Sequence, residues 1–179
     1  MRNWMLIGIL IFLSGCLEAP SQSPTLLNSS ITKIEAHAGL HGGDFIFINI
    51  YDNNTAKIEV GVYDSNEYIY KGAKQVPLRQ ILPDLERFVD LFNEGMNSKH
   101  VEVPLERSMG YDYLIEFSLK DGRGYGISQI IKGPIYIIAG PQTDFYLEKY
   151  SIAFISPLRD IGVKTFDLSP EIQDKFYDV

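Results

Sequence analysis

Alternating hydrophobic and polar positions predict β-strands over much of the chain. Residues 44–52, DFIFINIYD, place apolar side chains on both faces of an extended segment, which indicates a central strand. Asn53 and Asn54 predict a tight turn, and in residues 55–63 the apolar side chains at every second position share one face. We therefore expect residues 44–63 to form a hairpin.

A second group of strands is expected in the C-terminal half. Residues 111–120 alternate in the same way, and Asp121-Gly122 is a two-residue turn signal that predicts a hairpin with residues 123–133. Further short strands are predicted from apolar runs at residues 31–37, 66–72, 134–140 and 150–156. Residues 143–150, just before the last of these strands, could instead be helical.

One amphipathic helix is predicted over residues 78–94. Its apolar residues recur at three- and four-residue spacing and form a single stripe: Leu78, Ile81, Leu82, Leu85, Phe88, Val89 and Phe92. Pro83 suits the first turn of a helix, and Gly95 is expected to end it. Ser169 and Pro170 predict a short terminal helix.

The order of strands, helix and strands predicts an α+β fold. We expect a mostly antiparallel sheet of about six to eight strands, with the one main helix packed on one face. Residues 31–179 have the length of one ordinary domain, and we expect them to form a single globular unit.

The N-terminus has the features of a secretory signal. Arg2 precedes an apolar run at residues 4–13, which is too short to cross a hydrocarbon core that needs about 20 helical residues. Small residues follow at Ser14 and Gly15, so residues 1–15 are predicted to be a signal peptide.

Leu13-Ser14-Gly15-Cys16 resembles the lipobox of prokaryotic lipoproteins. The resemblance implies cleavage between Gly15 and Cys16, and attachment of lipid to the Cys16 thiol. It also implies a lipid-anchored protein on the extracytoplasmic face of the cell membrane. Residues 16–30 would then be the lipidated cysteine and a flexible tether, since they contain two prolines and four serines without any periodic pattern.

Charge and cysteine content exclude several classes of site. Cys16 is the single cysteine, so disulfides, a cysteine nucleophile and thiolate metal sites are excluded from the mature domain. Without residues 1–15 the chain has 15 Lys and Arg against 23 Asp and Glu, a net charge of −8. This charge argues against nucleic acid as a partner.

Residues 37–44, HAGLHGGD, are the first candidate for chemistry. His37, His41 and Asp44 are three potential ligands for a divalent metal, and the glycines between them would let the backbone bring them together. The alternative is a glycine-rich loop that binds no metal. Outside this segment the sequence shows neither a serine-nucleophile motif nor a phosphate-binding glycine motif, so no catalytic residue is predicted.

Tyrosines are the second candidate. Tyr68 and Tyr70 are predicted to share one face of their strand, as are Tyr111 and Tyr113, and exposed tyrosine rows bind glycans or extended peptides. The alternative is that they are cross-strand partners inside the sheet. We therefore expect a non-catalytic, lipid-anchored binding or accessory domain with a protein, peptide or envelope partner. The alternative function is a metal-binding or metal-dependent hydrolytic lipoprotein that uses His37 and His41.

Overall fold

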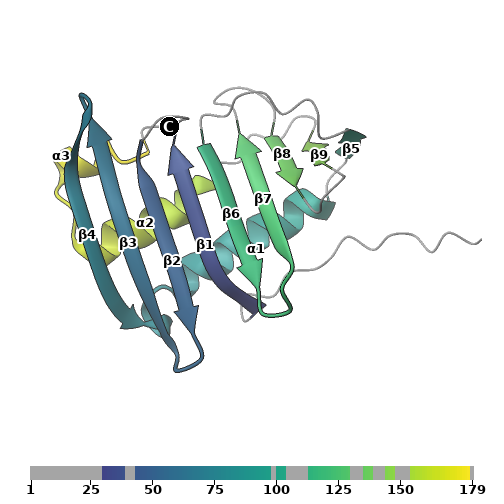
Figure 1. The fold of residues 1–179 in the computed structure, drawn as a ribbon, viewed down its shortest axis with the longest axis horizontal. Coiled ribbons are helices and arrows are strands. Elements are labelled where there is room, and N and C mark those ends of the chain that lie inside the picture. The colour runs from purple at the N-terminus through teal and green to yellow at the C-terminus, as the bar shows by residue number, and fades with distance from the viewer. Residues whose placement is uncertain are drawn as a thin grey trace, which may run out of the picture.

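One antiparallel sheet with helices on a single face makes up the fold (Figure 1). The computed structural model describes residues 30–38, 43–97, 100–103, 113–129, 135–138, 144–147 and 154–177. Nine strands of this part form a sheet in the order β4-β3-β2-β1-β6-β7-β8-β9-β5. Their bounds are β1 Ile31–Ala38, β2 Phe45–Tyr51, β3 Thr55–Asp64, β4 Glu67–Pro77, β5 His100–Val103, β6 Tyr113–Leu119, β7 Gly124–Gln129, β8 Ile135–Ile138 and β9 Asp144–Leu147.

The helices are η2 (a short 3-10 turn, Leu78–Gln80), α1 (Leu82–Asn97), α2 (Ile155–Phe166) and α3 (Pro170–Gln173). In Figure 1, α1 and α2 both lie behind the sheet, and none of the described helices lies on the face toward the viewer. Two ion pairs join α1 to α2: Lys164 Nζ lies 2.7 Å from Asp84, and Arg87 lies 2.9 Å from Asp160. Asp84 comes before Arg87 in α1, whereas its partner Lys164 comes after Asp160 in α2, so the two helices run antiparallel.

The core lies between the sheet and these two helices. Alternate residues of the central strands point into it, among them Ile34, Ile46 and Ile58, which are fully buried. From α1, Phe88 and Phe92 meet Phe117 edge to face, with ring centroids 5.5 Å and 5.0 Å apart. Such aromatic pairs add to the burial of apolar area and fix the position of α1 against the sheet.

The predicted α+β class is confirmed, and so are both hairpins. Asn54 adopts a positive φ of 60° in the β2–β3 turn, and Gly122 one of 86° in the β6–β7 turn. These are the conformations for which Asn and Gly are favoured. The nine strands exceed the expected six to eight, because β5 and β9 were not predicted, whereas β8 lies within the strand expected at residues 134–140.

The predicted main helix differs from α1 at both ends. Leu78–Gln80 forms the 3-10 turn η2, and α1 begins at Leu82 with Pro83 in its first turn. Gly95 does not end the helix, which continues to Asn97. The continuation buries Met96 against the core, where its side chain is 3% exposed, and Gly95 itself is buried.

A second long helix replaces part of a predicted strand. Residues 150–156 were expected to be extended, but α2 begins at Ile155, and residues 150–153 lie outside the described part. Ile155, Leu158 and Ile161 are fully buried at helical spacing, so tertiary packing selects the helix. Asp144–Leu147 is the strand β9, so the helical alternative for residues 143–150 is wrong there. The predicted terminal helix is α3, with Ser169 at its N-cap position.

Candidate binding site on the open sheet face

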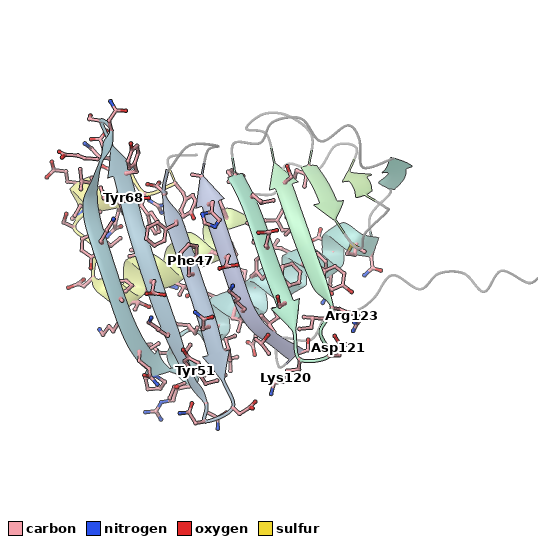
Figure 2. All side chains as sticks on the ribbon, in the orientation of Figure 1. Phe47, Tyr51, Tyr68, Lys120, Asp121 and Arg123 are labelled. Carbon is pink, nitrogen blue, oxygen red and sulfur yellow. The ribbon has the colours of Figure 1, made fainter. Side chains whose placement is uncertain are left out.

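Five aromatic rings form a continuous row across the face that the helices leave uncovered. We call this set the aromatic row: His37 of β1, Phe45 and Phe47 of β2, Tyr63 of β3 and Tyr68 of β4. The ring centroids are 5.0 Å apart for His37–Phe47, 4.8 Å for Phe45–Phe47, 5.7 Å for Phe45–Tyr68 and 5.1 Å for Tyr63–Tyr68. Figure 2 shows Phe47 and Tyr68 on the side of the sheet opposite to α1 and α2.

Strand alternation places these rings on the open face. Ile46 and Ile48 of β2 point into the core, so Phe45 and Phe47 point the other way. Phe45 is paired with His37 on one side and with Gly61 on the other. Its ring lies over Gly61, where a side chain would collide with it. A glycine opposite an aromatic residue thus gives the ring its place on the sheet.

A β-bulge decides which tyrosines join the row. The β3–β4 register pairs Val62 with Tyr70 but Tyr63 with Tyr68, so Ile69 is the extra residue. Tyr68 remains on the open face and is 37% exposed, whereas Tyr70 packs against Phe166 of α2 at 6.0 Å. The prediction that Tyr68 and Tyr70 share a face is therefore wrong, because the bulge reverses the alternation between them.

The second predicted tyrosine pair does not form a binding surface in the described part. Tyr113 is 2% exposed and belongs to the core. It shares the core side of β6 with Ile115 and Phe117, which also bury their side chains. The assignment of Tyr113 to a surface is therefore wrong, and its cross-strand alternative holds. Tyr111 lies outside the described residues.

A shallow hollow of about 380 Å³ adjoins the aromatic row where it meets the edge of the sheet. We call it the β4 hollow; its side chains come from Phe45, Phe47, Glu59, Lys71 and Ala73. The methyl group of Ala73 leaves the space that a larger residue would fill. The volume falls at the small end of the roughly 300–1,000 Å³ found for ligand sites.

Charged groups around the row are engaged in local pairs. Lys57 lies 3.0 Å from Glu59 on β3, and Lys33 lies 2.8 Å from Glu35 on β1. Lys71 Nζ stands 3.9 Å above the centroid of the Tyr68 ring, a cation–π geometry. The result is an apolar stripe with a polar border of both signs, as in many protein interfaces.

The predicted metal ligands are not brought together in the described part of the chain. The His37 ring packs against Phe47 on the open face. The Asp44 carboxylate accepts hydrogen bonds from the backbone N–H of Tyr63, at 2.7 Å, and of Tyr177 in the C-terminal segment. Burial of Asp44 raises the pKa of its carboxyl group above the usual value. His41 lies outside the described residues, and among those that are described no three His, Cys, Asp or Glu side chains could hold a metal ion.

Four residues of this surface were not predicted as site residues from the sequence: Phe45, Phe47, Tyr63 and Lys71. The signal was present: in residues 45–48 aromatic side chains alternate with isoleucines, so one face is aromatic and the other aliphatic. Because both faces are rich in apolar groups, that pattern predicts a central strand without showing which face the helices cover. Only the packing of the helices shows which face stays open.

Comparison of the chain with protein-family models, with curated proteins and with solved structures finds no match. Within the described ranges, no helix has the length and apolar composition needed to span a membrane. A function must therefore be inferred from the geometry of the aromatic row, together with the features of the N-terminal sequence.

Proposed function

We propose that this chain is a lipid-anchored, non-catalytic accessory protein of the cell envelope that binds a protein or peptide partner through the aromatic row. The observation that carries the proposal is the row itself: five contacting rings on the sheet face that α1 and α2 do not cover. Aromatic side chains dominate the energetics of interfaces, because they bury a large area at a small entropic cost.

The immediate surroundings of the row support a macromolecular partner. The border of Lys33–Glu35 and Lys57–Glu59 pairs carries no net charge, which favours neither nucleic acid nor a strongly charged surface. The patch is half-buried at His37, Phe45, Phe47 and Tyr63 and exposed at Tyr68. A contiguous, partly exposed aromatic patch on a small domain is a liability in solution unless a partner covers it. These features are typical of an interface with an apolar centre and a polar rim.

The N-terminal sequence supports the location. Lipidation at Cys16 would hold the domain at a membrane, and residues 17–30 could span at most about 45–50 Å if fully extended. A partner within that distance of the membrane surface would be accessible. Among the described residues, the Asp44 carboxylate is hydrogen-bonded to two backbone N–H groups, which argues against the metal-dependent alternative at His37, His41 and Asp44.

In-cell photo-crosslinking of the full-length chain tests this function. A crosslinking amino acid at Asn49, on the open face beside Phe47, should capture one reproducible partner, which mass spectrometry would identify. Phe47→Ser should abolish the capture. Tyr51→Ser is the matched control, because Tyr51 is an aromatic residue of the same strand that is 44% exposed but outside the row. Equal capture by wild type and Phe47→Ser would refute the proposal.

A further inference from the structure

Strand β4 is an open edge of the sheet. Among the described strands, it is hydrogen-bonded to β3 on one side and to nothing on the other. Most of its eleven residues are exposed, including Ile69 at 38%. Such an edge presents a line of backbone N–H and C=O groups that can pair with another extended chain.

The register shows which backbone groups point outward. Leu78 N donates to Asn54 O at 2.8 Å, which makes Thr55–Pro77 a non-hydrogen-bonded pair of the antiparallel ladder. Alternation along the ladder then directs the backbone groups of Gly72, Lys74 and Val76 toward β3. The N–H and C=O groups of Lys71, Ala73 and Gln75 point away from the sheet.

The outward-pointing residues are also those of the β4 hollow. Lys71 and Ala73 line it with their side chains on the open face. In an antiparallel pair, residues directly opposite each other place their side chains on the same face. A residue of an added strand that lies opposite Ala73 would therefore direct its side chain across the small methyl group into the hollow.

We propose that β4 binds an extended segment of the partner as an additional antiparallel strand, with one large apolar side chain in the β4 hollow. This inference rests on the proposed function and names the mode of recognition and the chemical class of the bound segment. Main-chain hydrogen bonds to Lys71, Ala73 and Gln75 would supply affinity, and the hollow would select the side chain. Phe45 and Phe47 form its apolar wall.

Charge along the edge adds a second requirement. Residues 68–77 contain two lysines, Lys71 and Lys74, and no acidic residue. Lys74 Nζ is hydrogen-bonded to the Thr165 carbonyl on the helix side, at 3.2 Å, which leaves Lys71 as the lysine of the open face. In antiparallel pairing, the residue two positions after the apolar one lies opposite Lys71. The bound segment should therefore contain an apolar residue, any residue, and then Asp or Glu.

Six synthetic heptapeptides provide the test. Their third residue is Phe, Leu or Ser, their fifth is Glu or Lys, the remaining positions are Thr, and both ends are capped. Calorimetric titration into the full chain in detergent should show binding of the Phe and Leu peptides that carry Glu. Ser at the third position, or Lys at the fifth, should weaken binding about tenfold.

Backbone methylation tests the predicted ladder directly. N-methylation of the third residue removes the N–H that would donate to Ala73 O, and should weaken binding at least tenfold. N-methylation of the fourth residue, whose N–H points away from β4, should leave affinity within about twofold.

On the protein side, Ala73→Pro removes an outward N–H that the β3–β4 ladder does not use, and proline is tolerated on edge strands in that orientation. Ala73→Ser keeps the N–H and is the matched control. Ala73→Pro should lose peptide binding while its circular dichroism spectrum stays the same as that of wild type. Ala73→Ser should bind the peptide as wild type does.

Three results would overturn the inference. The first is that no peptide binds at 1 mM. The second is that the affinity is the same whichever residue of the peptide is methylated. The third is that the full chain associates with itself, that Ala73→Pro abolishes this association, and that no peptide binds. The last would assign the edge to a second copy. Capture of a partner in cells that Phe47→Ser abolishes and Ala73→Pro does not would refute strand addition while leaving the proposed function intact.

Discussion

The ring of Phe45 lies directly on Gly61 of the neighbouring strand. A Cβ atom built on Gly61 would stand 2.7 Å from Phe45 Cδ1, far inside the normal carbon–carbon separation of about 3.5–4.0 Å. Phe45 also contacts Phe47 and Tyr68, so it links the two halves of the aromatic row. Any side chain at position 61 must displace this link.

We therefore predict that Gly61→Ala weakens partner binding about tenfold while the sheet remains folded. The overpacking should lower the free energy of unfolding by about 1–3 kcal/mol. Gly124→Ala is the matched control, because it is also a strand glycine and its added Cβ would meet only Phe117 O, at 3.7 Å. Urea unfolding and crosslinking of both variants are the measurements. Equal capture by Gly61→Ala and wild type would show that the position of Phe45 does not matter for binding.

A second prediction concerns Asp44 and the C-terminal segment. Asp44→Ala leaves the backbone N–H groups of Tyr63 and Tyr177 without their acceptor. Since an unsatisfied buried donor costs about 1–3 kcal/mol, we expect a loss of about 2–4 kcal/mol in the free energy of unfolding. Tyr177 OH, which donates to Ala36 O at 2.8 Å, should keep the segment partly attached. Chemical denaturation measures the loss, and a change below 0.5 kcal/mol would contradict it.

The pH dependence of stability should carry the sign of the Asp44 pKa shift. Burial raises the pKa of this carboxyl group in the folded state above its ordinary value of 3.8. Its contribution to stability is then fully present below pH 3.8 and is lost as the pH rises through the folded-state pKa. The free energy of unfolding of wild type minus that of Asp44→Asn should fall over this range.

Comparison with Asp44→Asn is needed because other carboxyl groups act in the opposite direction. Lys175 lowers the pKa of Asp64, and Arg123 lowers that of Asp121, so both contributions are lost as the pH falls. Both groups are present in wild type and in the variant, and they cancel in the difference. Urea unfolding from pH 3.5 to 7 is the measurement, and a difference that rises with pH would show that hydrogen bonding outweighs burial at Asp44.

Much of the fold could be predicted because its signals are local. Asn53-Asn54 and Asp121-Gly122 specify their hairpins within a few residues, and the apolar stripe of α1 is continuous. The helix α2 was not predicted because its N-cap residue, Phe154, and its first residue, Ile155, end a run that also fits a strand. Only the burial of Leu158 and Ile161 against the sheet distinguishes the two.

The candidate site could be predicted only in part, because it depends on long-range packing. The sequence shows aromatic residues on one side of β2, but not that the helices cover the other side. The bulge that separates Tyr68 from Tyr70 has no local signal, since it depends on the pairing of β4 with Val62 and Tyr63. Asp44 was assigned to a metal site because its true partner, Tyr177, lies 133 positions later in the chain.

The two ion pairs between α1 and α2 should differ in strength. Asp84 is 9% exposed at its side chain and receives both of its short contacts, 2.8 Å and 2.7 Å, from Lys164. Lys164→Ala would leave a buried carboxylate without its cation, so we expect a loss of about 1–2 kcal/mol in the free energy of unfolding. The Arg87–Asp160 pair is solvent-exposed, and Arg87→Ala should cost at most about 0.5 kcal/mol. Thermal unfolding of both variants measures which one loses more stability, and equal losses in the free energy of unfolding would contradict the prediction.

The last prediction concerns the anchor. If Cys16 is lipidated, Cys16→Ala removes the only thiol in the chain, and no lipid can be attached to sulfur. Cells fed an alkyne fatty acid should label the wild-type chain and not the variant, because the label follows the thioether-linked lipid. The wild-type chain should also begin at Cys16 by mass spectrometry, with Gly15 and everything before it removed. Tyr51→Ser, which leaves the N-terminus unchanged, should label as wild type does. Retention of the label by Cys16→Ala would refute the lipid anchor, while the aromatic row and its partner would remain to be tested on their own.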